Sequence, residues 1–372
     1  MTSITYIGMD VHTTNYTLCC YAIEEDRSFA IVQVQPVYTE ILKYIQRIRS
    51  QRGESTRFIC GYEAGCLGYS LYHQLTSHGV ECVILAPSTM PSERGKRVKT
   101  DRRDAEKISR CLAYGLYKPV YVPDAEDDAI KEYIRMRDDI KAQLKATKQQ
   151  IISFYTRHGF MFDGKCHWTK AHLSWIESLS FENEIYKETL WEYLLQYYHL
   201  DEKVAVYDKR IEEFSHMDRY EDNVGKLCCF PGIATHTAMS LLVEIGDFNR
   251  FKAAPQFAAY LGLAPGEHSS GGKQRFTGIT KAGNSHLRWL LIESAQHYSR
   301  HSTVKKAKTL LARQAGQPSE VIAYADKAGD RLKRKFHRIA LHSKHNIAKT
   351  AIARELACFV WGMMTNHISN AG

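Results

Sequence analysis

The stretch that decides the fold is Lys99 to Ala105, KTDRRDA, which opens a predicted helix that continues through residues 106–109. Asp101 and Asp104 lie three residues apart in it. At 3.6 residues per turn, positions i and i+3 share one face of a helix, so both carboxylates should point the same way. Two adjacent carboxylates repel each other unless a cation lies near them. The candidates are a divalent metal ion or a neighbouring Lys or Arg.

An ion-paired surface turn is the ordinary alternative. Lys99, Arg102, Arg103 and Lys107 crowd the same stretch, and acidic side chains are favoured near a helix N-terminus. On these residues alone both interpretations stay open. The first three of these basic residues are also predicted to contact a nucleic-acid backbone, because they belong to a basic cluster over residues 94–103.

Composition places the chain among ordinary globular proteins with a polyanionic partner. The 372 residues are 44% hydrophobic and 24% charged, which predicts two domains and a further helical element. The formal net charge is +9, and basic residues cluster at 94–103 and 327–338. A positive charge of this size suits nucleic acid, and on its own it is moderate evidence.

The sequence also predicts a cytoplasmic location. The ten cysteines show no paired CxxC or Cys/His finger spacing, so we expect reduced thiols and no zinc finger. The N-terminal residues lack a basic region followed by an apolar core and a cleavage site. No apolar run approaches the roughly 18 residues that a membrane span needs.

Residues 4–85 alternate between short apolar runs and helical periodicity. The expected strands are 4–10, 16–23, 28–34, 57–62 and 81–85, and the expected helices are 41–48 and 69–77. With the helix that begins at KTDRRDA, this is the element order of a ribonuclease-H-like mixed α/β sheet. We therefore predict an α/β domain over residues 1–122.

Four acidic residues fall where such a sheet would bring them together. Asp10 ends the first strand, Glu63 ends the fourth, and Asp101 and Asp104 lie on the helix after the fifth. Strand ends converge on a crevice at the carboxyl edge of a sheet of this kind. Four converging carboxylates predict two Mg²⁺ ions, which prefer hard oxygen ligands. Taken singly, Asp10 suits a strand-end turn and Glu63 a helix cap.

Residues 123–222 are predicted to form a helical arm. Helical periodicity covers residues 129–154, is interrupted at residues 158–168, and returns through residues 191–211. This spacing favours a helical hairpin or coiled coil over a globular domain. Its role is either dimerisation and spacing or plain helix packing.

The remaining residues, 223–372, are predicted to form a mostly α C-terminal domain. Pro231, Gly232 and Ile233 make a tight turn before a helix that begins near Thr235. This is the pattern of a helix-hairpin-helix, in which backbone N–H groups bind a phosphate, so we predict nucleic-acid contacts at Gly232 and Thr235. An ordinary turn between packed helices is the alternative.

A glycine-rich segment over residues 262–288 places hydroxyl groups among cations. Ser269 and Ser270 precede two glycines, and the basic residues that follow are Lys273, Arg275 and Lys281. Such surroundings would hold a phosphate beside a nucleophilic oxygen. A loop that contacts phosphate without chemistry is equally open on these residues.

The tail of the chain is again helical. Residues 327–338, KAGDRLKRKFHR, could contact a nucleic-acid backbone or form a solvated helix face. Residues 346–364 are predicted to form a final amphipathic helix that packs on the C-terminal domain.

Six of these motifs resemble the IS110 family of bacterial transposases, which also includes Piv-type DNA invertases. They are GMDVH, GYEAG and KTDRRDAEKI in the N-terminal part, and GLAP, SSGG and ITKAGN in the C-terminal part. The resemblance spans roughly residues 5–300. It implies a RuvC-like nuclease domain whose DEDD positions are Asp10, Glu63, Asp101 and Asp104. The family's catalytic serine maps to Ser270, or to Ser269 if the register differs by one.

The resemblance also implies a function and partners. A family member is a DNA recombinase that moves its own mobile element with Mg²⁺, as a dimer that pairs into a tetramer on donor and target DNA. A bridge RNA encoded beside the gene selects the DNA. Three alternatives stay open: a Piv-type site-specific invertase, a junction-resolving nuclease that uses only the acidic quartet, and a non-enzymatic nucleic-acid-binding protein.

Overall fold

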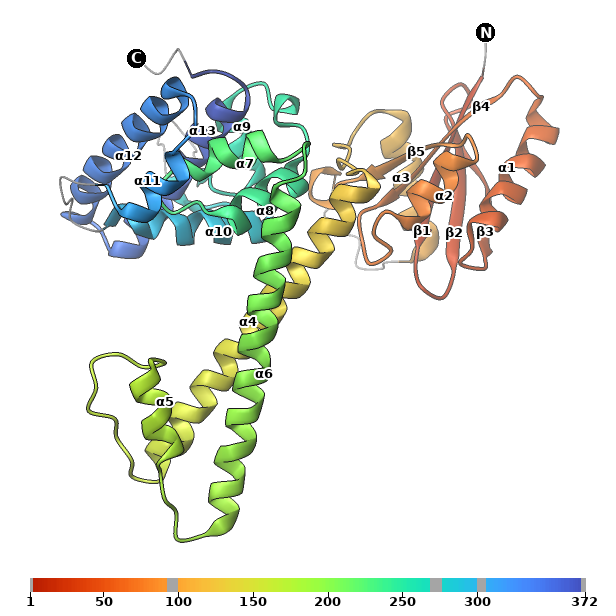
Figure 1. Ribbon diagram of the computed structural model, residues 1–372. Helices are drawn as coiled ribbons and strands as arrows, with labels where there is room; N and C mark the ends of the chain where they lie inside the picture. The colour runs from red at the N-terminus through yellow and green to blue at the C-terminus, as the bar shows by residue number, and fades with distance from the viewer. Residues whose placement is uncertain (1–2, 92–99, 268–275, 300–305, 369–372) are drawn as a thin grey trace. The chain divides into compact units, whose positions relative to one another are not determined.

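The computed structural model describes residues 3–91, 100–267, 276–299 and 306–368 (Figure 1). The chain divides into two compact units, Met1–Val122 and Pro123–Gly372. Five of the predicted site residues, Lys99, Ser269, Ser270, Lys273 and Arg275, lie outside the described residues.

The first unit is built on a five-stranded mixed sheet in the order β3-β2-β1-β4-β5. Its strands are β1 Ile4–Val11, β2 Tyr16–Ala22, β3 Arg27–Val34, β4 Arg57–Glu63 and β5 Glu81–Leu85. The first three form an antiparallel meander, while β4 runs parallel to β1 and β5 runs parallel to β4. The predicted mixed α/β sheet is confirmed, and it fits a RuvC-like fold.

Helices cover both faces of this sheet. They are α1 Tyr38–Arg52, α2 Ser70–Ser77, the short η1 Pro87–Thr89 and α3 Asp101–Ala113. Successive strand residues point to opposite faces. Ile7 and Met9 of β1 therefore join the core with α1 and α2, whereas Tyr6 packs with α3.

Two adjacent strands, β1 and β4, carry glycines where they meet α3. Gly8 of β1 and Gly61 of β4 are partners in the parallel ladder. A Cβ on Gly8 would lie 2.2 Å from the Ala105 carbonyl oxygen and 2.3 Å from the Ser109 nitrogen, so the backbone of α3 rests directly on the strand. A Cβ on Gly61 would lie 2.8 Å from side-chain atoms of Leu112. This pair of glycines lets α3 pack closely on the sheet.

The second unit begins with two long helices, α4 Ala125–Arg157 and α6 Glu184–Ser215, which pack side by side (Figure 1). An ion pair joins Arg137 Nε to Asp208 Oδ1 at 2.6 Å, and the rings of Tyr133 and Tyr207 make an edge contact. A short helix that the sequence did not predict, α5 Lys170–Glu177, packs against this helical pair through Ile176. The predicted helices are confirmed, while their description as a coiled coil stays a prediction.

The rest of the second unit is a helical core with one small hairpin. Its elements are α7 Glu221–Cys228, α8 Thr235–Ile245, η2 Phe248–Arg250, α9 Ala254–Tyr260, β6 Pro265–Glu267, β7 Phe276–Ile279, α10 Ser285–Ala295, η3 Gln296–Ser299, α11 Lys308–Gln314, α12 Ser319–Ala340 and α13 His345–Met364. The predicted final helix is present as α13, and it contacts α9, α10 and α12.

The boundary predicted after residue 222 falls inside α7, so the division into arm and C-terminal domain stays a prediction. The segment predicted as a polar loop contains the antiparallel strands β6 and β7.

Gly8→Ala is expected to lower the stability of the first unit by at least about 2 kcal/mol, because the added methyl group overlaps the backbone of α3. Urea unfolding should be followed by dithiodipyridine labelling of the buried Cys60. The matched control is Gly65→Ala, since the nearest atom to its added Cβ lies 3.8 Å away. Equal unfolding midpoints for the two variants would contradict the close packing of α3.

Candidate active site

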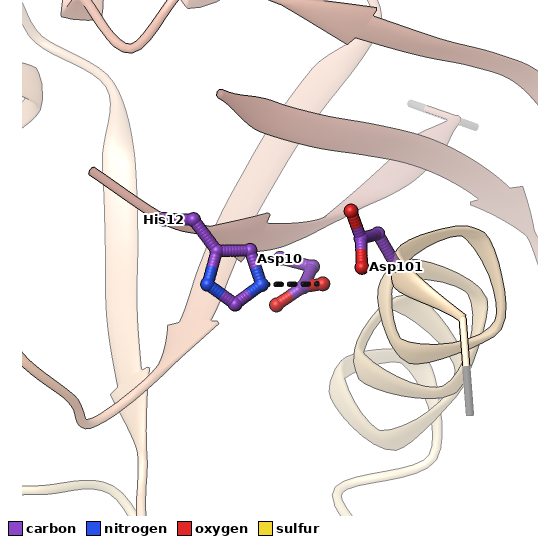
Figure 2. Close-up of side chains that lie close together, drawn as sticks. All are labelled: Asp10, His12 and Asp101. Atoms are coloured by element: carbon purple, nitrogen blue, oxygen red, sulfur yellow. Dashed lines mark hydrogen bonds and ion pairs between the residues drawn. The ribbon is translucent and has the colours of Figure 1, made fainter. Parts of the chain in front are cut away.

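The site is centred on Asp10, near the carboxyl end of β1. Its Oδ2 atom lies 3.3 Å from His12 Nε2. Asp101, the first residue of α3, faces Asp10 (Figure 2). One ligand atom from each of Asp10, His12 and Asp101 can be chosen so that all three lie within 4.8 Å of one another. Two carboxylates and an imidazole therefore converge on one point.

The start of α3 is fixed by its capping residue. The Thr100 side chain accepts a hydrogen bond from the Arg103 N–H at 3.4 Å, and its carbonyl oxygen accepts one from the Asp104 N–H at 3.0 Å. Thr is a favoured N-cap because its hydroxyl satisfies a backbone donor of the first turn. The cap places Asp101 and Asp104 in the first turn of the helix, as the sequence predicted.

The pKa of Asp10 is raised from its ordinary value. Burial raises the pKa of Asp10, and the carboxylates of Asp104 and Asp101 raise it further, while His12 opposes the shift. Like charges disfavour ionisation of a neighbour, and a nearby cation restores it. Asp101 and Asp104 are therefore close enough to influence Asp10, and a bound cation would offset their effect.

Glu63 reaches the same edge of the sheet but has a different neighbour. Tyr62 pairs with Met9, so Glu63 and Asp10 are the next residues along two adjacent parallel strands. The Glu63 Oε1 atom lies 3.9 Å from Lys107 Nζ on α3. Glu63 is not part of the group that Asp10, His12 and Asp101 form. Glu63 therefore forms an ion pair with a basic residue of α3.

The basic residues Arg102 and Arg103, predicted around the site, lie in the first turn of α3. Arg102 and Arg103 are both exposed, and Arg102 Nε lies 4.0 Å from Glu106 Oε1. Their exposure leaves the guanidinium groups accessible to a polyanion.

His12 is the residue that the sequence analysis missed. The GMDVH motif places it two residues after Asp10, a spacing at which side chains of an extended chain share a face. That spacing was the available signal.

The donor set fits a divalent cation. Carboxylate oxygens are the ligands that Mg²⁺ and Mn²⁺ prefer, and an imidazole nitrogen is a ligand for transition metals. Asp10 and Asp101 could hold the ion, with His12 beside them.

Three of the contacts predicted in the second unit, Gly232, Thr235 and Lys281, lie within the described residues. Gly232 has φ +87°, and a Cβ there would lie 2.4 Å from the Ser294 carbonyl oxygen, so packing alone requires glycine. Thr235 is the first residue of α8. Lys281 is exposed, and its backbone N–H donates to the Gly262 carbonyl oxygen at 3.1 Å.

A second cluster of charged residues, which sequence reasoning also missed, joins α4 to α8 and α10. His286 Nδ1 lies 2.6 Å from Glu244 Oε1, and its Nε2 lies 2.8 Å from Asp138 Oδ2. Burial opposes protonation, yet the hydrogen bonds to Asp138 and Glu244 raise the pKa of His286 to about 9. Asn284 caps α10 and donates to Glu244 Oε2 at 2.6 Å. Because these residues come from distant parts of the sequence, no local spacing signals the cluster.

Comparison with known proteins identifies the family. A family of DEDD transposases of the IS110 type matches residues 7–159, and the transposase IS116/IS110/IS902 family matches residues 225–312. Within the described part of the chain, helices of membrane-spanning length and hydropathy are absent.

Individual relatives cover most of the chain. A Sinorhizobium fredii protein described as a transposase, y4qE, is 34% identical over 81% of this chain and 74% of its own length. The transposase for insertion sequence element IS1533 of Leptospira borgpetersenii is 32% identical over 90% of this chain and 96% of its own length. The chain belongs to the IS110/IS116/IS902 family of transposases, enzymes that cleave and rejoin DNA.

Asp10→Asn is expected to stabilise the metal-free protein at neutral pH. Because the folded-state pKa of Asp10 is raised, the stability it contributes is present below the unfolded pKa of about 4 and is lost as pH rises through the folded value. The variant should therefore be more stable to unfolding than wild type at pH 7 but not below about pH 4. Urea unfolding in EDTA, read by labelling of Cys60, measures the difference.

A divalent metal ion should make wild type more stable than Asp10→Asn at pH 7. An ion that binds only the folded state, present at 100 times its dissociation constant, adds about 2.7 kcal/mol to the free energy of unfolding. Wild type should show this increase and Asp10→Asn should not. Glu54→Gln, at an exposed acid of the same unit, is the control and should respond like wild type. If metal stabilises wild type and Asp10→Asn equally, Asp10 is not a metal ligand.

Proposed function

We propose that this chain is the recombinase of an insertion sequence and that it cuts and rejoins DNA by transesterification with a serine nucleophile. The observation that carries the proposal is the convergence of Asp10 and Asp101 within the group of ligand atoms, with Asp104 close enough to shift the pKa of Asp10. The proposed metal ligands are these three residues and Glu63. The proposed ion is Mg²⁺.

Ser270 is the proposed nucleophile, and Ser269 replaces it if the register differs by one. The serine Oγ forms a bond to phosphorus while the bond from phosphorus to a deoxyribose oxygen breaks, and that oxygen leaves as a hydroxyl. A deoxyribose hydroxyl of another DNA end then attacks the same phosphorus and releases the serine. Each step exchanges one phosphoester bond for another, so no ATP is consumed. A divalent ion held by the acidic residues would supply Lewis-acid stabilisation of the departing oxygen.

The partners follow from the family resemblance. We propose that a bridge RNA selects donor and target double-stranded DNA in the cytoplasm. Backbone contacts are assigned to Lys99, Arg102, Arg103, Gly232, Thr235, Lys273, Arg275 and Lys281. The exposure of Arg102, Arg103 and Lys281 supports this assignment.

The long helix α6 supports a proposed dimer that pairs into a tetramer. Trp191, Leu195, Tyr198 and Val206 share one side of the helix, and they are 53%, 46%, 39% and 57% exposed. Contiguous exposed apolar side chains mark protein contacts. A second copy of the chain would cover this stripe. Assembly would also allow a composite site with acids from one protomer and serine from another.

A covalent adduct tests the serine mechanism. Purified protein, RNA transcribed from the DNA that flanks the gene, labelled DNA and Mg²⁺ should yield a protein–DNA adduct that survives SDS. Ser270→Ala should abolish the adduct, and Asp101→Asn should reduce it at least about 100-fold, because the site would lose a metal ligand.

The matched control for this experiment is Ser269→Ala, which should keep the adduct. If Ser269→Ala loses the adduct and Ser270→Ala keeps it, the register is shifted by one residue. Retention by both variants contradicts a serine nucleophile. Nicked DNA without any adduct would instead indicate a nuclease that uses the acids and water.

The dimer prediction concerns the α6 stripe. Trp191→Lys/Leu195→Lys should convert the dimer to a monomer in light scattering coupled to gel filtration, because two buried charges oppose apolar contact. The control adds the same charge at exposed positions of α4 with Ala142→Lys/Gln149→Lys. If both double variants remain dimeric, the stripe is not the interface.

A further inference from the structure

Helix α12 carries a basic stripe along its solvent side. Lys327, Arg331, Arg334 and Arg338 recur at intervals of three and four residues, and all four are exposed. The buried residues of the helix lie on the other side: Val321, Tyr324, Ala325, Ala328, Gly329, Leu332 and Phe336. The helix is therefore strongly two-sided, with apolar packing on one side and cations on the other.

Part of this stripe lines a hollow. Arg331, Arg334, Lys335 and Arg338 surround a depression of about 430 Å³. We call these four residues and Lys327 the α12 patch.

The patch remains positive after its acidic neighbours are included. Glu355 of α13 accepts from Arg331 Nε at 2.5 Å and pairs with Lys335 through its other oxygen. Asp330 is exposed between Lys327 and Arg334. Five cations thus face two acids. Among the described residues, ion pairs to Lys327, Arg334 or Arg338 are not found.

The helix dipole does not account for this arrangement. Cations are favoured within the last turn of a helix, and α12 ends at Ala340. That preference covers Arg338 but not Lys327 or Arg331. The patch also lies beyond residues 225–312, where the family match of the C-terminal part ends.

We propose that the α12 patch binds the phosphate backbone of duplex DNA, as a contact separate from the acidic site. From Lys327 to Arg338 the helix rises roughly 16 Å, and duplex DNA carries about one negative charge per 1.7 Å of axis. Guanidinium groups match phosphate oxygens in charge and shape. All four side chains that line the hollow are Lys or Arg, so its ligands are backbone phosphates rather than bases, and a regular row of phosphates is what a duplex backbone offers.

Salt-dependent binding tests this proposal. Anisotropy titrations with a fluorescent 30-base-pair duplex, in EDTA and at several KCl concentrations, should compare wild type with Lys327→Gln/Arg334→Gln/Arg338→Gln. Each phosphate contact contributes about 0.9 to the slope of log affinity against log salt. Loss of three contacts should lower the slope by about 2.7 and weaken binding at least tenfold at 100 mM salt.

The matched control removes the same charge from exposed lysines of the arm, Lys141→Gln/Lys145→Gln/Lys209→Gln. It should bind the duplex nearly as wild type does, and both triple variants should keep the wild-type melting temperature. An equal loss in both variants would show only a general effect of net charge and overturn the proposal. Unchanged duplex DNA binding by the patch variant also overturns it.

A parallel titration with hairpin RNA separates the possible partners. If the patch variant loses RNA binding and keeps DNA binding, the surface serves RNA and the proposal is wrong. Because EDTA removes catalysis from the measurement, the titration reports duplex binding alone and its outcome does not depend on the serine step. Failure of the α12 patch is therefore distinguishable from failure of the serine mechanism.

Discussion

The contact on which the acidic site depends is the close approach of α3 to the sheet at Gly8 and Gly61. These glycines are ladder partners, and each precedes an acid by two residues, in GMD and in GYE. Positions two residues apart on a strand share a face. The glycines therefore let the helix backbone rest on the strands, while Asp10 and Glu63 emerge on the same face at the edge of the sheet. A larger residue at Gly8 would displace the helix that carries Asp101 and Asp104.

Packing holds together charges that would otherwise separate. The buried contacts of Ile108 and Leu112 fix α3, and the Thr100 cap fixes its first turn. Burial is the main reason that the pKa of Asp10 is raised, and the carboxylates of Asp104 and Asp101 add to the shift. Lys107 partly neutralises Glu63, while the neighbour of Asp10 that opposes the rise in its pKa is the exposed His12. A divalent ion would neutralise the remaining negative charge of the carboxylates. DNA phosphates would then meet a site that is less negative.

Much of the first unit could be predicted from sequence because its signals are local. Short apolar runs indicated the strands, and the D-x-x-D spacing placed two carboxylates on one face of α3. The acids' positions relative to strand ends then predicted their convergence. The Asp138, Glu244 and His286 cluster could not be predicted in this way, because it depends on how α4, α8 and α10 pack. The helix α5 was missed because the aromatic segment before it lacks clear periodicity. The serine assignment depends on family resemblance, since Ser269 and Ser270 lie outside the described residues.

The central claim is that the fold brings Asp10 and Asp101 together to hold a divalent ion. Anomalous diffraction from crystals grown with Mn²⁺ tests it most directly. The account predicts a manganese peak within about 2.5 Å of a carboxylate oxygen of both residues, and its disappearance in Asp10→Asn. Manganese bound elsewhere, with Asp10 and Asp101 making no contact to it, would contradict the account.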